Sequence, residues 1–305
     1  MLPCPAARFV QAGLAPGSRQ SGRRQPNARV QNGAVCTVVV SLDPAEPVPL
    51  RLLGVRDELV SRPWRPPARH WPGSPLIGGI DEQAGGTWLA VHPGVPRVAC
   101  LLNGRGPLAD PAVRHSRGEL PLRAAAEGPR MLAQLAGDLD ALAAYDAFHL
   151  ICASPDAVTA LSWPGRDPAA PDTRPAVRVL APGTHLFTNA GHAYPVEPGD
   201  PAGEPKAAHF AEKFAAARPP ADPALPVAQA WGDWLTLAAG DGLDPAGPAA
   251  IMVRRVLPDG QLYGSTSVTL VALAADGIRY DFQPRPGDID SWYAVADARI
   301  TKGQS

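Results

Sequence analysis

Short apolar runs dominate the chain from residue 36 onward. Val38–Val40, Leu50–Val55, Trp88–Val91 and Val98–Leu102 are each a few residues long and rich in β-branched or large apolar side chains. Such runs, bounded by Gly, Pro and Asp, are typical of β-strands. The pattern therefore predicts a framework of several short strands.

Longer segments show a helical pattern. Residues 118–145 predict one or two helices with a break at Gly128-Pro129. Pro205–Ala217 predicts another, because proline favours the first turn and the apolar positions recur at helical spacing. On it, one packed face is indicated by His209, Phe210 and Phe214. A fourth helix is predicted through "VAQAWGDWLTLAA", residues 227–239.

Turn and loop signals separate these elements. Asp259-Gly260 and Asp276-Gly277 interrupt apolar runs and predict hairpin turns. Ser162–Thr173 and Tyr194–Glu204 are rich in Pro, Gly and acidic residues and predict exposed loops. The C-terminal region thus reads as a meander of strands.

Composition narrows the class of protein. The chain has 305 residues and a net charge of −1, which argues against a nucleic-acid-binding protein. No apolar run approaches the roughly 18 residues that predict a transmembrane helix, so no membrane span is expected. The cysteines Cys4, Cys36, Cys100 and Cys152 form neither a CxxC pair nor a disulfide framework. This usage predicts a reducing compartment, the cytoplasm, and the GC-rich character of the composition favours a bacterial source.

Cofactor and metal motifs are absent from the sequence. The seven histidines show no HExxH spacing, and the chain contains no GxSxG, GxxxxGK or GxGxxG signature. No cofactor or metal is therefore expected.

The first 34 residues differ from the rest. They contain five arginines, no acidic residue and no apolar core long enough for a signal peptide. Two interpretations remain open: a disordered tail, or an extension that is not translated. In the second, a GTG codon at Val35 starts translation, and removal of the initiator methionine leaves Cys36 at the N-terminus.

An N-terminal cysteine has distinctive chemistry. Its α-amine has an unperturbed pKa of about 7.7 to 8.0 and can activate the thiol of the same residue without a histidine. The alternative is that Cys36 is a small buried apolar residue, as most free cysteines are.

A series of motifs follows Cys36 in a fixed order. They are Arg56-Asp57-Glu58, Ser61-Arg62-Pro63, Gly85-Gly86-Thr87-Trp88, Asn103, Ser116-Arg117-Gly118-Glu119 and Asn189. This series resembles the NRDE family, which includes the eukaryotic transport and Golgi organisation proteins. Two positions depart from the family pattern: Val55 replaces the first asparagine of its name-giving motif, and Ser265-Thr266 stands where relatives often carry arginine.

The resemblance implies a fold and a site. The fold is α+β, a four-layer αββα sandwich of the N-terminal nucleophile hydrolase type, formed by one domain over residues 35–305. In distant relatives an arginine lies beside the nucleophilic cysteine, an acid orients its α-amine, and asparagines at strand ends bind the oxyanion. These roles transfer to Cys36, Arg56, Asp57 or Glu58, Asn103 and Asn189, with Arg56 favouring the thiolate.

Simpler roles remain open for the same residues. Arg56 and Asp57 also fit a structural ion pair, Asn103 and Asn189 fit turn positions, and Trp88 fits the core. The implied activity is hydrolysis of a linear amide through Cys36. The alternative is a non-catalytic carrier of a hydrophobic small molecule such as a lipid or haem, which the Ser265-Thr266 departure favours.

Overall fold

The computed structural model describes residues 36–197, 200, 203–275 and 277–295. The expectations for residues 1–34 fall outside these ranges, as does Asp276 of one expected turn. Part of the loop expected over Tyr194–Glu204 also lies outside them.

Cys36 precedes the first strand of an antiparallel sheet. Within the described ranges this sheet has eight strands in the order β11-β10-β1-β2-β13-β14-β15, and β12 also pairs with β13. Their bounds are Thr37–Leu42 (β1), Leu50–Leu59 (β2), Gly183–Thr188 (β10), Gly191–Tyr194 (β11), Arg254–Val256 (β12), Leu262–Ala274 (β13), Gly277–Gln283 (β14) and Tyr293–Ala294 (β15).

The second sheet is also antiparallel and follows chain order. Its seven described strands run β3-β4-β5-β6-β7-β8-β9. Their bounds are Trp64–Ala68 (β3), Ile77–Asp81 (β4), Leu89–His92 (β5), Arg97–Asn103 (β6), Phe148–Ala153 (β7), Val158–Trp163 (β8) and Ala176–Leu180 (β9).

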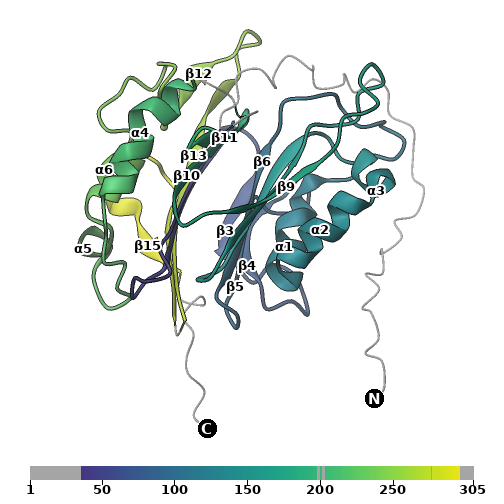
Figure 1. Cartoon of the computed structure of the whole chain (residues 1–305). Helices are drawn as coiled ribbons and strands as arrows, with labels where there is room; N and C mark the ends of the chain where they lie inside the picture. Colours follow the sequence, from purple (N-terminus) through teal and green to yellow (C-terminus); the bar gives the residue numbers. More distant parts are fainter. Residues whose placement is uncertain (1–35, 198–199, 201–202, 276, 296–305) are drawn as a thin grey trace, which may run out of the picture.

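Helices cover the outer face of each sheet, as Figure 1 shows. The first sheet is covered by α4 (Pro205–Ala216), α5 (Val227–Trp231) and α6 (Asp233–Ala238), and the second by α1 (Leu120–Glu127) and α2 (Pro129–Gly137), with α3 (Leu139–Ala143) beside α2. Short 3₁₀ turns lie at Arg117–Glu119 and Ile289–Ser291. The expected four-layer αββα sandwich is therefore confirmed.

Burial on both faces explains the unbroken apolar run of β1. Val38 and Val40 pack between the two sheets, whereas Val39 faces the layer of α4–α6. A strand buried on both sides needs apolar side chains at consecutive positions rather than at alternate ones. The start of β1 is thereby fixed inside the sandwich.

Helix boundaries partly follow the expectations. The break at Gly128 is present, with φ of +83°, but residues 118–145 form three helices rather than one or two. The helix expected over residues 227–239 is divided at Gly232, whose φ of +47° is accessible to glycine and rarely to other residues. On α4, Phe210 and Phe214 are fully buried, but His209 lies at the edge of that face and contacts Asp241.

The expected turn at Asp259-Gly260 joins β12 to β13, and residues 164–175 form no helix or strand between β8 and β9.

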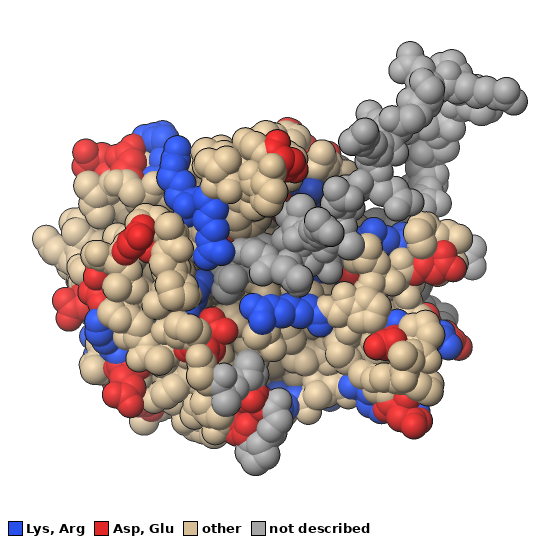
Figure 2. Space-filling model, turned by 90° about the horizontal axis from the view of Figure 1, so that it is seen from above, with Lys and Arg blue, Asp and Glu red and all other residues tan. Residues whose placement is uncertain are grey.

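In the part of the chain that the structure describes, no helix has the length and apolar character needed to cross a membrane. Seen from above, a band of Lys and Arg side chains runs from one edge of the described surface toward its middle, and Asp and Glu side chains are scattered on both sides of it (Figure 2).

Candidate active site

Cys36 lies where three strands meet. In the antiparallel pairing, Thr37 is opposite Val55 of β2. Continuing the registers of β1 by one residue toward β2 and by two residues toward β10 puts Cys36 opposite Arg56 and Asn189. Three residues predicted from separate motifs are thus brought to the same end of the first sheet.

The Cys36 thiol contacts the backbone of β2. Its Sγ accepts a hydrogen bond from the Asp57 N–H at 3.4 Å and lies 3.5 Å from the Asp57 carbonyl oxygen. Burial and the nearby Asp57 carboxylate raise the pKa of the thiol to about 12, although the charge of Arg56 opposes the change. Arg56 thus acts on the thiol in the expected direction, but burial outweighs its charge, and the pKa of the Cys36 thiol lies above its usual range.

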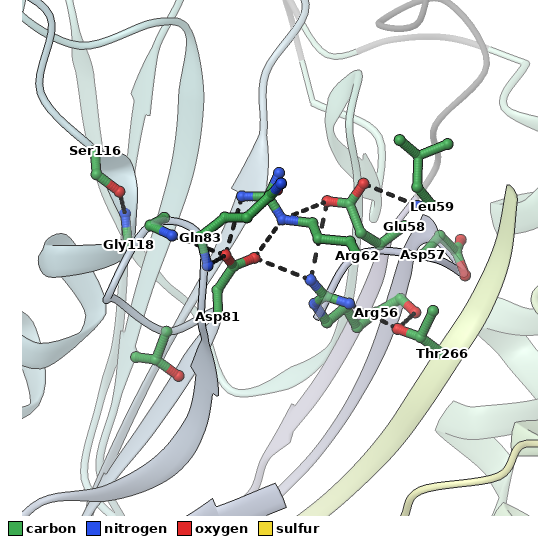
Figure 3. Close-up of polar contacts among 12 residues, drawn as sticks. Arg56, Asp57, Glu58, Leu59, Arg62, Asp81, Gln83, Ser116, Gly118 and Thr266 are labelled. Carbon is green, nitrogen blue, oxygen red and sulfur yellow. Dashed lines mark hydrogen bonds and ion pairs between the residues drawn. The ribbon is translucent and has the colours of Figure 1, made fainter. Parts of the chain in front are cut away.

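Arg56 points toward other partners (Figure 3). One terminal nitrogen donates to Thr266 Oγ1 at 2.9 Å, and the other donates to Asp81 Oδ2 at 3.1 Å. The guanidinium carbon also lies 4.6 Å from the ring centre of Trp88, within the range of a cation–π contact. Trp88 therefore packs against the core and also supports Arg56.

Asp81 joins the two arginines of the motif. Arg62 donates to it through Nε at 2.5 Å and a terminal nitrogen at 3.0 Å, and the backbone N–H groups of Gln83 and Ala84 donate to its Oδ1. Burial alone would raise the pKa of Asp81, but the hydrogen bond and charge of Arg62 hold it below its usual range. The carboxylate is thus a charged anchor for Arg56 and Arg62, and Glu58 lies beside both arginines.

The Asp57 carboxyl group is hydrogen-bonded to a residue of β13. Ser265 Oγ donates to its Oδ1 at 2.5 Å, whereas its Oδ2 is buried without a hydrogen-bond partner among the described residues. Burial raises the pKa of Asp57 to about 7, against the opposing charges of Lys206 and Arg56 and the Ser265 hydrogen bond. Ser265 and Thr266 lie at a bulge in β13, so the departure from the family pattern supplies hydroxyl partners for both Asp57 and Arg56.

Lys206 was not anticipated as part of the site. Its side chain, on the first turn of α4, is 1% exposed, and its Nζ donates to Thr37 Oγ1 at 2.7 Å. Burial lowers the pKa of Lys206, although Asp57 and Cys36 both act to raise it. The sequence does contain an indication of this position: Lys206 lies four and eight residues before Phe210 and Phe214, so it falls on the same, buried face of the helix.

A cavity of about 310 Å³ brings the motifs together. Its lining includes Cys36, Arg56-Asp57-Glu58, Arg62, Asp81, Gly86-Thr87-Trp88, Asn103, Arg114–Gly118 and Asp146. Of the predicted site residues, only Asn189 is outside this lining. Its side chain is buried, and its Oδ1 has no hydrogen-bond partner in the described ranges.

Two glycine motifs shape one wall of this cavity. A Cβ atom at Gly86 would lie 2.4 Å from the Gly118 carbonyl carbon, and the Thr87 N–H donates to the Gly118 carbonyl oxygen at 2.8 Å. This close backbone approach requires glycine. It also positions Arg117, which donates to the Ala147 carbonyl at 2.6 Å beside Asp146.

No group of three or more His, Cys, Asp and Glu side chains able to hold a metal ion occurs in the described part of the chain. The cavity lining carries the Cys36 thiol, several carboxyl and guanidinium groups, the Asn103 amide, the His115 imidazole and the hydroxyl groups of Thr87 and Ser116.

Comparison with known proteins gives the family. Two solved structures are similar in part: a mutant of the conjugated bile acid hydrolase from Clostridium perfringens (9% identity, 85% of this chain, 92% of that chain, TM-score 0.43) and the N-acylethanolamine-hydrolyzing acid amidase ortholog from Caenorhabditis elegans (13%, 84%, 95%, 0.39). No match is found among curated proteins. The model of the family described as Transport and Golgi organisation 2 matches residues 35–218. Because that match covers more than half of the chain, the protein belongs to the Transport and Golgi organisation 2 family, as the resemblance to NRDE proteins predicted.

Proposed function

We propose that this protein is a cysteine amidohydrolase in which Cys36, as the N-terminal residue of the mature chain, attacks a linear amide. The observation that carries the proposal is a pair of buried acceptors beside Cys36. Asp57 Oδ2 and Asn189 Oδ1 have no hydrogen-bond partner among the described residues. A buried acceptor without a donor costs about 1–3 kcal/mol, and an α-amine on Cys36 would supply donors between the two flanking strands.

The α-amine is the base of the proposed reaction. It takes the proton from the neutral Cys36 thiol, and the sulfur forms a bond to the amide carbonyl carbon. The resulting α-ammonium group gives that proton to the leaving nitrogen as the C–N bond breaks, which leaves an acyl-thioester. Water then adds with the amine again as base, and the carboxylic acid leaves as the thiol is restored.

Electrostatics around the amine support this role. Lys206 lies beside Thr37, and a nearby positive charge disfavours protonation of an amine. Asp57 opposes that effect when it is ionised, and its raised pKa of about 7 makes this opposition depend on pH near neutrality. The charge of Lys206 thereby favours the unprotonated amine, which is the form that accepts the thiol proton.

Asn103 is the proposed oxyanion donor, because its side chain lines the same cavity as Cys36. One such donor is worth about 3 kcal/mol of transition-state stabilisation. Asn189, buried opposite Cys36, would instead hold the α-amine.

The test uses protein that begins at Cys36, assayed against N-acyl amino acids, penicillin V-like amides and N-acyl homoserine lactones. Wild type should release amine from at least one class, whereas Cys36→Ala should release none. Asn103→Ala should lower kcat roughly a hundredfold. Absence of turnover of every class, with equal binding of a lipid or porphyrin to wild type and Cys36→Ala, would replace the enzyme with the carrier alternative.

A further inference from the structure

A second cavity lies beside the first and shares none of its lining residues. Its volume is about 260 Å³. The second sheet contributes residues of β7, β8 and β9, and the first sheet contributes residues of β10 and β11. Gly104-Arg105 directly follows Asn103 of the first cavity, so the two cavities are adjacent along this chain segment.

The charges lining this second cavity do not balance. Three guanidinium groups, those of Arg105, Arg174 and Arg178, accompany a single carboxylate, Asp200. That carboxylate is already engaged: Oδ1 pairs with Arg178 at 2.5 Å, and Oδ2 lies 2.9 Å from His192 Nδ1.

The other two arginines have no close carboxylate partner among the described residues that would neutralise their charge. Arg105 is exposed and forms no ion pair with a described residue. Arg174 donates to the carbonyl oxygens of Pro171 and Thr173, and its nearest carboxylate, on fully exposed Asp172, is 4.0 Å away. An exposed pair of this kind contributes little, so two positive charges face the cavity without effective neutralisation.

The inner part of the cavity is neutral and partly apolar. His149 lies 2.8 Å through Nδ1 from Ser162 Oγ and also hydrogen-bonds the Asn189 backbone. Burial lowers the pKa of His149 to about 4, so it adds no charge at neutral pH. Apolar surface comes from buried Trp163, Phe187 and Leu180.

We propose that this second cavity binds a small organic anion, with its carboxylate or phosphate at Arg105 and Arg174 and its short apolar part against Trp163 and Phe187. Guanidinium groups suit both anions, because their N–H donors match pairs of anionic oxygens. The volume lies just below the usual range for drug-sized ligands, which favours a small molecule. The site stands independently of the proposed amide hydrolysis.

The test is calorimetric titration of the full chain with hexanoate, hexyl phosphate and hexylamine. At least one of the two anions should bind and hexylamine should not; the two anion arms separate a carboxylate from a phosphate ligand. Arg105→Gln should weaken binding of that anion roughly tenfold, the loss expected for one charge-assisted contact. Arg105 is exposed and has no ion pair among the described residues, so this variant should fold normally.

Two control variants locate the binding. Arg123→Gln, on the exposed face of α1, and Arg114→Gln, in the first cavity, should leave the affinity unchanged. The proposal is overturned if neither anion binds at millimolar concentration, if hexylamine binds equally well, or if Arg114→Gln abolishes binding while Arg105→Gln does not.

Discussion

Asp57→Asn tests whether burial of the Asp57 carboxyl group makes the stability of the protein depend on pH. Burial moves the pKa of Asp57 from 3.8 to about 7. The native state therefore binds a proton that the unfolded chain releases, and native stability falls as the pH rises from about 4 through 7. Asparagine resembles the neutral carboxylic acid but does not titrate, so the Asp57→Asn variant should not lose stability in this way as the pH rises.

The size of the effect follows from the shift. A shift of about 3 pH units corresponds to about 4 kcal/mol. The free energy of unfolding of Asp57→Asn, relative to wild type, should therefore rise by about 4 kcal/mol between pH 4 and pH 8. Urea unfolding followed by tryptophan fluorescence at several pH values measures this difference. Asp172→Asn, at a fully exposed carboxylate, is the matched control and should show no such rise. Parallel stability curves for wild type and Asp57→Asn would refute the reasoning.

Three further predictions concern Lys206, Gly118 and the cysteines. Lys206→Met should move the acidic limb of the kcat/KM pH profile up by about one pH unit, because a positive charge beside the α-amine is lost; an unmoved limb with altered stability alone would leave Lys206 a structural residue. Gly118→Ala should lower the free energy of unfolding by about 1–3 kcal/mol through its contact with Gly86, and the open position Gly137→Ala should not; equal thermal melts would contradict the close approach. Iodoacetamide should label Cys36 before the buried Cys100 and Cys152, since of these three thiols only that of Cys36 lines the first cavity. Arg56→Ala should slow the labelling of Cys36, because it removes a charge that lowers the pKa of this thiol. Peptide mapping that finds the three thiols labelled equally would show that Cys36 is an inert core residue.

Much of the fold is readable from local pattern. The apolar runs at β1 and β6 predict strands because residues buried on both faces of a sheet must be apolar in succession. The helix break at Gly128-Pro129 is likewise a local backbone property. The division between α5 and α6 was missed, because a single glycine inside an apolar helical pattern does not reveal its positive φ.

The site is only partly readable in the same way. The motif order predicts which residues meet, and the shared cavity lining of Cys36, Arg56 and Asn103 agrees with that expectation. The guanidinium of Arg56 is oriented by Asp81 and Thr266, which come from other strands, so these partners could not be inferred from motif spacing. Lys206 reaches β1 from a helix far along the chain, and no motif connects the two.

The most direct test of the central claim is the mass of the acyl-enzyme. Protein beginning at Cys36 and protein beginning at Met1 are each mixed with the best amide substrate, quenched in acid and digested. The account predicts an acyl group on the peptide that begins with Cys36, and none on the longer chain, which lacks an α-amine at that residue. Equal acylation of both chains, or an acyl group on Cys100 or Cys152, would contradict it.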